Sequence, residues 1–320
     1  MRAAAFSLVV LTLNVAGPRR LHQGWPTRRQ AILAGLKSQD ADVDALQEVY
    51  RGDDLMALAG APAGHAARAF DESLGLAVTS RLPVVSYASR ALGGGYGVLR
   101  ARLRAAAGEF DVYSARLEPG EGDAAARRLG QLFRTAEFVR AESAGRPFVL
   151  LGDLGVGADE RDSTLLLDML EARDLCVSHG DEVCGRTLAD RRVDYALIPY
   201  SSRPPAANAR AVLTDLLPDE DEAAALHFGL RARLDGAFLR LKPSLAPPGR
   251  DEALASIEDA LGEAIAEQNR RVAAAGWIPF LGARRLAEAS DEAARLTAVQ
   301  EEVRTARQRA VKRESPSTPE

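Results

Sequence analysis

Short apolar runs recur between residues 1 and 240, separated by polar and glycine-containing stretches. Runs of this length and composition are typical of strands in the interior of a sheet. The predicted strands are SLVVLTL (7–13), VDALQEV (43–49), LGLAVTS (74–80), YGVLRARL (96–103), FDVYSARL (110–117), RPFVLLGD (146–153), RRVDYALIP (191–199) and FGLRARL (228–234).

Amphipathic helices are predicted between some of these strands. Residues 28–39 and residues 124–143 both carry apolar side chains at helical spacing. These positions are Ile32, Leu33 and Leu36 in the first helix and Leu129, Leu132, Phe133, Phe138 and Val139 in the second.

The turn around Ala107 and Gly108 favours an antiparallel hairpin, because it separates two strands by only a few residues. Hairpins of this kind do not fit a purely parallel, doubly wound sheet. We therefore expect an α/β fold with a mixed sheet, or two packed sheets, flanked by helices. The glycine-rich stretch 93–97 (GGGYG) lacks the strand-to-helix context and the lysine of a phosphate-binding loop, and is interpreted as a flexible loop.

The composition changes at LKPSLAPPGR (241–250), a proline-rich stretch typical of a linker. Two amphipathic helices follow and predict a helical hairpin. Their apolar positions are Leu254, Ile257, Leu261 and Ile265 in the first and Leu286, Ala289, Ala293, Leu296 and Val303 in the second. The predicted organisation is a main domain over 1–241, a linker over 242–250, a hairpin over 251–313 and a disordered end over 314–320.

The predicted turn of this hairpin is more apolar than a solvent-exposed turn requires. It contains Trp277, Ile278, Phe280 and Leu281. We expect these side chains to pack on the main domain, and the alternative is contact with a membrane surface or a partner protein.

The overall composition indicates a soluble globular protein, with 47% hydrophobic and 27% charged residues. The net charge of −4 argues against a non-specific nucleic-acid binder and leaves room for a local basic patch.

The first residues resemble a short secretory signal, but the run that ends at Asn14 fits a core strand better. Cys176 and Cys184 are too few for a disulfide framework or a zinc site. We expect two reduced thiols, with a single loop disulfide as the alternative. The expected location is cytoplasmic, and secretion is the alternative.

Polar side chains follow or precede several of the predicted strands. Asn14, Glu48 and Asp153 lie at strand ends, Asp194 lies in the run 191–199, and His227 precedes the last strand. One such residue is commonly a turn or cap residue, but five on separate strands suggest a site where strand ends converge.

In this order the motifs resemble the endonuclease/exonuclease/phosphatase superfamily. The resemblance covers nearly all of residues 1–240 and combines short stretches that are individually weak. They are LTLNVAG, LQEV, GLAVTSRLPV, VYSARLE, RLGQLFRTAEFV, LLGDLG, RRVDYALI and LHFGLRARL. The resemblance implies a four-layer α/β/β/α sandwich and hydrolysis of a phosphate ester, such as a phospholipid head group, a nucleotide or nucleic acid, with Mg²⁺ or Mn²⁺ as cofactor.

The same resemblance implies a role for each of the five residues. Glu48 matches the metal-binding glutamate, and Asn14 matches the asparagine that helps to place metal and phosphate. Asp153 matches the aspartate that orients or deprotonates the attacking water. His227 matches the histidine that contacts the phosphoryl oxygens, and Asp194 matches the aspartate that braces it.

The chain departs from the family pattern at three positions. Gly155 replaces the asparagine of GDxN, Arg116 replaces the histidine of THL, and Leu226 replaces the aspartate of SDH. Loss of one orienting group typically slows an enzyme by about 10² to 10³. Arg116 keeps a positive charge that suits a phosphate, but it cannot act as an acid or base near neutral pH.

Two functions therefore remain open. One is an altered or slow metal-dependent phosphoesterase that uses Asn14, Glu48, Arg116, Asp153, Asp194 and His227. The other is a binding module that has kept the fold without the activity. A serine hydrolase is not favoured, because the sequence has no G-x-S-x-G motif.

Overall fold

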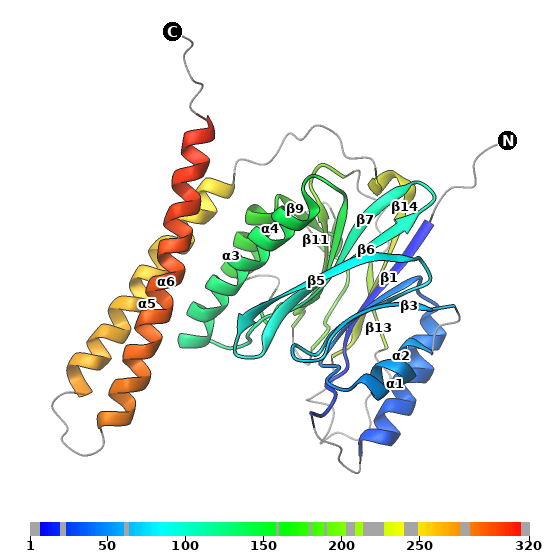
Figure 1. Cartoon of the computed structure of the whole chain (residues 1–320), viewed down its shortest axis with the longest axis horizontal. Coiled ribbons are helices and arrows are strands. Elements are labelled where there is room, and N and C mark those ends of the chain that lie inside the picture. The colour runs from blue at the N-terminus through cyan, green and yellow to red at the C-terminus, as the bar shows by residue number, and fades with distance from the viewer. Residues whose placement is uncertain are drawn as a thin grey trace, which may run out of the picture.

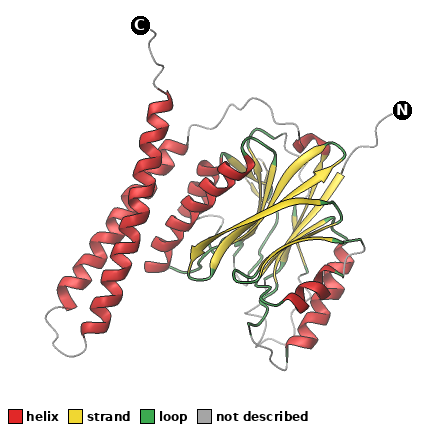
Figure 2. Ribbon diagram, in the orientation of Figure 1, coloured by secondary structure: helices red, strands yellow, loops and turns green. Residues whose placement is uncertain are grey.

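The computed structural model describes residues 7–19, 24–60, 64–157, 160–178, 181–188, 191–202, 209–213, 227–239, 249–275 and 282–314. Within these residues two six-stranded sheets face each other, and helices cover their outer faces (Figure 1). Figure 2 shows the same layers coloured by secondary structure. The predicted α/β sandwich of two mixed sheets with a C-terminal helical hairpin is confirmed.

The first sheet is built around two parallel strands, β1 (Ser7–Asn14) and β2 (Val43–Gln47), and all other neighbouring strands in it pair antiparallel. The side chains of β1 are buried on both faces after its first residue, so its sequence is a continuous apolar run. In spatial order the strands are β13 (Arg210–Val212), β14 (Gly229–Asp235), β1 (Ser7–Asn14), β2 (Val43–Gln47), β4 (Leu76–Ser80) and β3 (Ala67–Asp71).

The second sheet has one parallel pair, β7 (Gly108–Arg116) and β8 (Phe148–Asp153), among antiparallel neighbours. In spatial order its strands are β5 (Val84–Gly93), β6 (Tyr96–Ala105), β7 (Gly108–Arg116), β8 (Phe148–Asp153), β12 (Asp194–Pro199) and β9 (Ala172–Asp174). The predicted hairpin at Ala107 is present, because Ala105 pairs with Gly108 across the turn. A short separate pair joins β10 (Val177–Ser178) to β11 (Asp181–Glu182).

The glycine-rich stretch at 93–97 connects β5 to β6 rather than forming an independent loop. Gly93, Gly94 and Gly95 all have positive φ, which allows the chain to reverse there. The turn presents Tyr96 at the start of β6.

The inner faces of the two sheets share an apolar core. Its members alternate along the strands with residues that face the outer helices. This packing fixes the relative position of strands that reach the candidate site from opposite sheets. The buried side chains of the core include Val10, Val43, Val78, Leu99, Val112, Leu151, Ile198, Leu230 and Leu234.

The outer face of the first sheet is covered by α1 (Trp25–Gln39) and α2 (Gly52–Ala59). Trp25 is buried between these helices and the sheet, and its indole nitrogen donates a hydrogen bond to Asp54 Oδ1 over 3.0 Å. Asp54 also pairs with Arg29 at 2.7 Å. These contacts tie α2, which the sequence did not predict, to α1.

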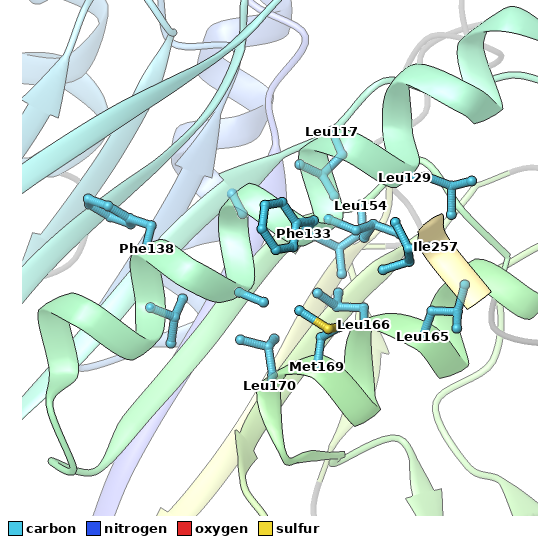
Figure 3. Packing of buried hydrophobic residues seen from close by; sticks show 14 of the residues in the cluster. Leu117, Leu129, Phe133, Phe138, Leu154, Leu165, Leu166, Met169, Leu170 and Ile257 are labelled. Carbon is cyan, nitrogen blue, oxygen red and sulfur yellow. The ribbon is translucent and has the colours of Figure 1, made fainter. Parts of the chain in front are cut away.

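The outer face of the second sheet is covered by α3 (Asp123–Ser143) and α4 (Arg161–Leu170). Figure 3 shows Phe133 of α3 in the middle of this cluster, with Leu154 from the loop after β8 and Ile257 beside it. One apolar cluster therefore joins the sheet, both helices and the C-terminal segment.

The C-terminal helices α5 (Arg250–Ala275) and α6 (Gly282–Glu314) pack against each other and lie outside α3 (Figure 1). Gly130 of α3 permits a close approach, because a Cβ there would lie 2.9 Å from Val299 Cγ1. Two ion pairs flank this contact, Arg127–Glu292 at 3.0 Å and Arg134–Glu302 at 2.8 Å. None of the described helices has the length and hydropathy needed to cross a membrane.

The apolar residues of the hairpin turn, Trp277, Ile278, Phe280 and Leu281, lie outside the described residues. The surface contact through this turn therefore stays a prediction. Most of the predicted linker over 242–250 and of the predicted disordered end over 314–320 also lies outside them.

Cys176 and Cys184 form a disulfide, so the expectation of two reduced thiols is wrong and the alternative of one loop disulfide is correct. The antiparallel pairing of β10 with β11 brings the two cysteines together. Val183 N–H donates to the Cys176 carbonyl over 2.8 Å in the same turn.

Candidate functional site

The five polar residues predicted at strand ends meet at one end of the two sheets. Asn14 and Asp153 are the last residues of β1 and β8, and Glu48 follows β2. Asp194 opens the antiparallel strand β12 and pairs in register with Asp153, while His227 precedes β14. The carboxyl ends of the parallel strands and the amino ends of their antiparallel neighbours therefore supply the same site.

Asn14 connects the two sheets at this end. Its side-chain amide Nδ2 donates to Glu48 Oε1 over 2.9 Å and to Asp153 Oδ2 over 3.0 Å. Its Oδ1 accepts a hydrogen bond from Ala16 N–H over 2.9 Å, which fixes the orientation of the amide. The carboxyl groups of residues 48 and 153 thus lie in one cluster, as predicted.

Glu48 has a constrained backbone. Its φ is +58°, in the left-handed region that residues other than glycine adopt infrequently. Gly17 N–H donates to the Glu48 carbonyl over 3.1 Å, and a Cβ at Gly17 would lie 2.4 Å from that oxygen. The loop after β1 therefore holds Glu48 in place, and only glycine fits at position 17.

Gln47, the residue before Glu48, is held by hydrogen bonds in the interior between the two sheets. Its amide Nε2 donates to Ser114 Oγ of β7 over 3.0 Å and to Thr12 Oγ1 of β1 over 3.1 Å. These bonds link the two sheets in the buried layer directly under the site.

Asp153 is oriented by a backbone amide. Asp153 Oδ1 accepts a hydrogen bond from Gly155 N–H over 3.0 Å. Gly155 has a φ of +63°, and a Cβ there would lie 2.9 Å from backbone atoms of Glu118 and Pro119. The loop after β7 thus fills the space next to Gly155, and the orienting bond to Asp153 comes from the main chain.

His227 is held between two carboxylates. Its Nδ1 lies 2.8 Å from Asp194 Oδ2, and its Nε2 lies 3.7 Å from Asp153 Oδ2. Asp194 is completely buried, whereas the His227 side chain keeps 12% of its surface exposed. Of the two ring nitrogens, Nδ1 thus faces Asp194 and Nε2 faces Asp153.

Thr187 positions both members of the Asp194–His227 pair. Its buried hydroxyl accepts hydrogen bonds from the backbone N–H groups of Val193 and Asp194, each over 3.1 Å. Its carbonyl accepts from Phe228 N–H over 2.7 Å, one residue after His227. The sequence did not point to Thr187, because it lies in a short irregular segment that has no apolar pattern.

Burial and neighbouring charges shift two pKa values in the site. Burial by itself lowers the pKa of His227, but the carboxylates of Asp194, Asp153 and Glu48 outweigh it and raise the pKa to about 9. Burial also raises the pKa of Asp153, against the opposing effect of the His227 charge. At neutral pH His227 is therefore an imidazolium, and Asp153 is a stronger base than an exposed aspartate.

Arg116 forms an ion pair with Glu48. One terminal guanidinium nitrogen lies 2.9 Å from Glu48 Oε1, and the other donates to Tyr50 Oη over 3.3 Å. The guanidinium also lies over the Tyr96 ring, 4.9 Å from its centroid. Arg19 lies over the Tyr50 ring at 4.2 Å and adds an exposed cation at this edge.

Tyr50, Tyr96 and Arg19 were not among the predicted site residues. Tyr50 comes two residues after Glu48, and Tyr96 lies in the glycine-rich stretch 93–97. An aromatic residue within a glycine-rich turn was the available signal for Tyr96, whereas Arg19 had none.

Glu48 and Asn14, the expected metal-binding residues, do not fit a divalent cation as they are arranged. Asn14 turns its N–H groups, not its oxygen, toward the carboxylates. A cation about 2.1 Å from Glu48 Oε1 would lie within about 5 Å of the Arg116 nitrogen. At an effective dielectric constant of about 20 the repulsion is roughly 7 kcal/mol. In the part of the chain that the structure describes, no three acidic, histidine or cysteine side chains are placed to hold a metal ion.

Leu226, the third predicted departure from the family pattern, lies outside the described residues. The five candidate residues at strand ends and Arg116 all lie in the cluster described above.

Comparison with known proteins agrees with this fold. The sequence profile of the Endonuclease/Exonuclease/phosphatase family matches residues 11–210. The matched range contains Asn14, Glu48, Arg116, Asp153 and Asp194 and ends before α5. None of the curated proteins compared matches the chain.

Several solved structures share the fold at low sequence identity. Sphingomyelinase C from Streptomyces griseocarneus is 18% identical, with 71% of this chain and 99% of that chain covered and a TM-score of 0.54. TDP2 from D. rerio, complexed with a single strand DNA product, is 12% identical, with 71% and 98% covered and a TM-score of 0.58. A mutant of beta toxin from Staphylococcus aureus with bound magnesium ions is 11% identical, with 71% and 99% covered and a TM-score of 0.56.

Proposed function

Since this chain belongs to the Endonuclease/Exonuclease/phosphatase family, we propose that it hydrolyses a phosphate ester that binds between the side chains of Asp153 and His227. The observation that carries the proposal is the arrangement of these two groups. A buried carboxylate, oriented by Asn14 and by Gly155 N–H, lies 3.7 Å from an imidazole that a second carboxylate holds. This arrangement supplies a base and a cation side by side.

Asp153 acts as the general base in this proposal. A water molecule beside it attacks phosphorus, and one water proton passes to the Asp153 carboxylate. A bond forms between the water oxygen and phosphorus while the bond from phosphorus to the leaving oxygen breaks. The leaving oxygen takes a proton from solvent, and Asp153 returns its proton to solvent. The raised pKa of Asp153 favours the first transfer.

His227 binds the phosphoryl oxygens as an imidazolium. Asp194 keeps its Nδ1 occupied, so that Nε2 remains the nitrogen available to substrate. Because the charge on the phosphoryl oxygens changes during attack, a fixed cation there stabilises the transition state. Thr187 holds Asp194 and the His227 backbone in register.

The dependence on Mg²⁺ or Mn²⁺ implied by the family resemblance has one line of support, the magnesium ions bound in the related beta toxin structure. The arrangement of Glu48, Asn14 and Arg116 speaks against it in this chain. No step of the proposed reaction therefore passes through a metal ion.

The substrate class stays open among a phospholipid head group, a nucleotide and nucleic acid. The related structures include a sphingomyelinase and a protein with a DNA product, and this range does not select among these classes. Cytoplasmic location also stays a proposal.

A second candidate function is binding of a phosphate ester without hydrolysis. One observation favours it: Arg116, at the position of a family histidine, can neither accept nor donate a proton near neutral pH. Both candidate functions use the same site, but only the first converts the bound phosphate ester to products.

The test is hydrolysis of bis-p-nitrophenyl phosphate by the full chain, compared with Asp153→Asn. We expect the variant to be slower by about 10²- to 10⁴-fold, since it removes the general base. Asp53→Asn, at a side chain that is 90% exposed, is the matched control and should keep the wild-type rate. Equal rates for all three proteins would rule out this site, and no turnover of any phosphate ester would leave the binding function.

A further inference from the structure

The carboxylate that the family pattern assigns to a metal already has a cation next to it. Arg116 lies 2.9 Å from Glu48 Oε1, and the same oxygen accepts a hydrogen bond from Asn14 Nδ2. The negative charge of Glu48 is thus balanced from within the chain.

The Arg116 guanidinium is held by more than this one contact. Tyr50 Oη accepts from one terminal nitrogen, and the Tyr96 ring covers one face of the guanidinium. The side chain is 17% exposed and that of Glu48 is 22% exposed, so a ligand can reach both. A guanidinium fixed on several sides loses little conformational freedom when it binds an anion.

Arg116 also lies next to the residues proposed to act in the reaction. It pairs in register with Asp153 across β7 and β8, and Asn14 bridges Glu48 to Asp153. A phosphoryl group placed beside Asp153 and His227 is therefore next to the Arg116–Glu48 pair. Guanidinium groups bind phosphate oxygens with two parallel N–H donors, which a single histidine cannot do.

We propose that the Arg116 guanidinium takes the place of the divalent cation, so that Arg116 and His227 bind the phosphoryl group of the substrate without a metal ion. The proposal rests on the proposed function in using the same site, but it concerns the binding step and not the turnover. Glu48 then serves to orient Arg116 rather than to ligate a metal.

The first experiment measures binding of inorganic phosphate and of phenyl phosphate to the full chain by isothermal titration calorimetry. The titrations are run in EDTA and again with excess MgCl₂ or MnCl₂. We expect the Kd in EDTA and the Kd with metal to agree within about threefold, because the cation that binds phosphate belongs to the chain. Arg116→Gln should weaken binding by about tenfold or more, and Arg104→Gln, at an exposed arginine on β6, should not.

The second experiment restores the residue of the family motif. Arg116→His removes the permanent cation from Glu48, so Mn²⁺ should now bind, as detected by electron paramagnetic resonance. The added substitution Glu48→Gln should abolish that binding. Thermal melts of all variants exclude loss through unfolding.

The proposal is overturned if the wild-type chain binds phosphate only with Mg²⁺ or Mn²⁺, or binds neither phosphate nor metal. It is also overturned if Mn²⁺ binds the wild-type chain at micromolar concentration and Glu48→Gln removes it. Phosphate binding in EDTA without turnover would sustain this proposal and refute hydrolysis. Turnover that requires a metal would sustain hydrolysis and refute this proposal.

Discussion

The backbone N–H of Gly155 donates a hydrogen bond to Asp153 Oδ1 over 3.0 Å, at the position where the family motif GDxN has an asparagine side chain. A main-chain donor thus supplies the orienting contact that the sequence suggested was lost. The loop at Glu118 and Pro119 fills the space that a side chain would need. The departure at Gly155 therefore does not by itself indicate an inactive site.

Restoring the family asparagine should harm the protein. In Gly155→Asn the new Cβ would lie 2.9 Å from the Glu118 carbonyl, so the loop after β7 must shift. We expect a loss of about 1–3 kcal/mol in unfolding free energy and a lower hydrolysis rate. Urea denaturation and initial rates measure both. An Asn variant that is as stable as wild type and faster would contradict the role of the Gly155 amide.

Thr187 should act as a positioning residue. Thr187→Val keeps the shape but leaves the buried N–H groups of Val193 and Asp194 without their acceptor, at a cost of about 1–3 kcal/mol each. We expect kcat to fall by about 10- to 100-fold with KM changed little, since the substrate does not touch Thr187. Thr187→Ser keeps the hydroxyl and should recover most of the rate. A loss of stability with an unchanged kcat would show that Thr187 is structural only.

The pH profile of hydrolysis should be bell-shaped. The rate rises as Asp153 ionises, above the usual range of an aspartate because burial raises its pKa. The rate falls as His227 loses its proton near pH 9, the pKa to which the surrounding carboxylates raise it. The same shift affects the stability of the fold, because the folded-state pKa lies above the value of 6.5 for a free histidine. The contribution of His227 to the free energy of unfolding is therefore fully present below pH 6.5 and is lost as the pH rises through about 9.

Asp194→Asn is the variant that tests the upper limb. It removes a carboxylate 2.8 Å from His227 Nδ1, so the upper limb should move to lower pH. Initial rates across the pH range measure the shift. An upper limb that stays near pH 9 in this variant would assign it to another group.

A second buried carboxylate, Asp44 in β2, should make the fold less stable at high pH. Burial raises its pKa from 3.8 to about 8, and the adjacent His65 is kept neutral because burial lowers the histidine pKa. Since the folded chain holds this proton more tightly than the unfolded chain, stability is lost as the pH rises from about 4 through about 8.

Replacing Asp44 should remove that loss. At about pH 9, Asp44→Asn should be more stable than wild type by about 2 kcal/mol or more, because no buried charge forms. The difference should shrink toward acidic pH, and Asp53→Asn, at an exposed position, should show neither effect. Thermal melts across this pH range measure the change. A difference that does not depend on pH would contradict a buried, titrating Asp44.

The sequence predicted the strands that carry the site because these strands are continuous apolar runs with one polar residue at an end. Asn14 and Asp153 follow this rule, since β1 and β8 are buried on both faces. The edge strand β5 was missed because its alternate side chains are exposed and several of these are small or polar, as at Ser89 and Ala91. A partly solvated edge carries no continuous apolar run.

The contacts that complete the site could not be predicted from residue types. The Gly155 amide is a main-chain group, so no side chain signals its bond to Asp153. The Thr187 hydroxyl acts through two backbone N–H groups six and seven residues away. The pairing of Arg116 with Glu48 depends on the packing of one sheet against the other. Each depends on tertiary placement rather than on local sequence.

A double-mutant cycle between Asp153 and His227 tests most directly whether the two residues form one catalytic unit. Initial rates of bis-p-nitrophenyl phosphate hydrolysis are measured for wild type, Asp153→Asn, His227→Gln and the double variant. We expect the double variant to be no more than about threefold slower than the slower single variant, since residues that act as a unit are strongly non-additive. Losses that multiply in full would show that Asp153 and His227 act independently, and would contradict a shared catalytic role.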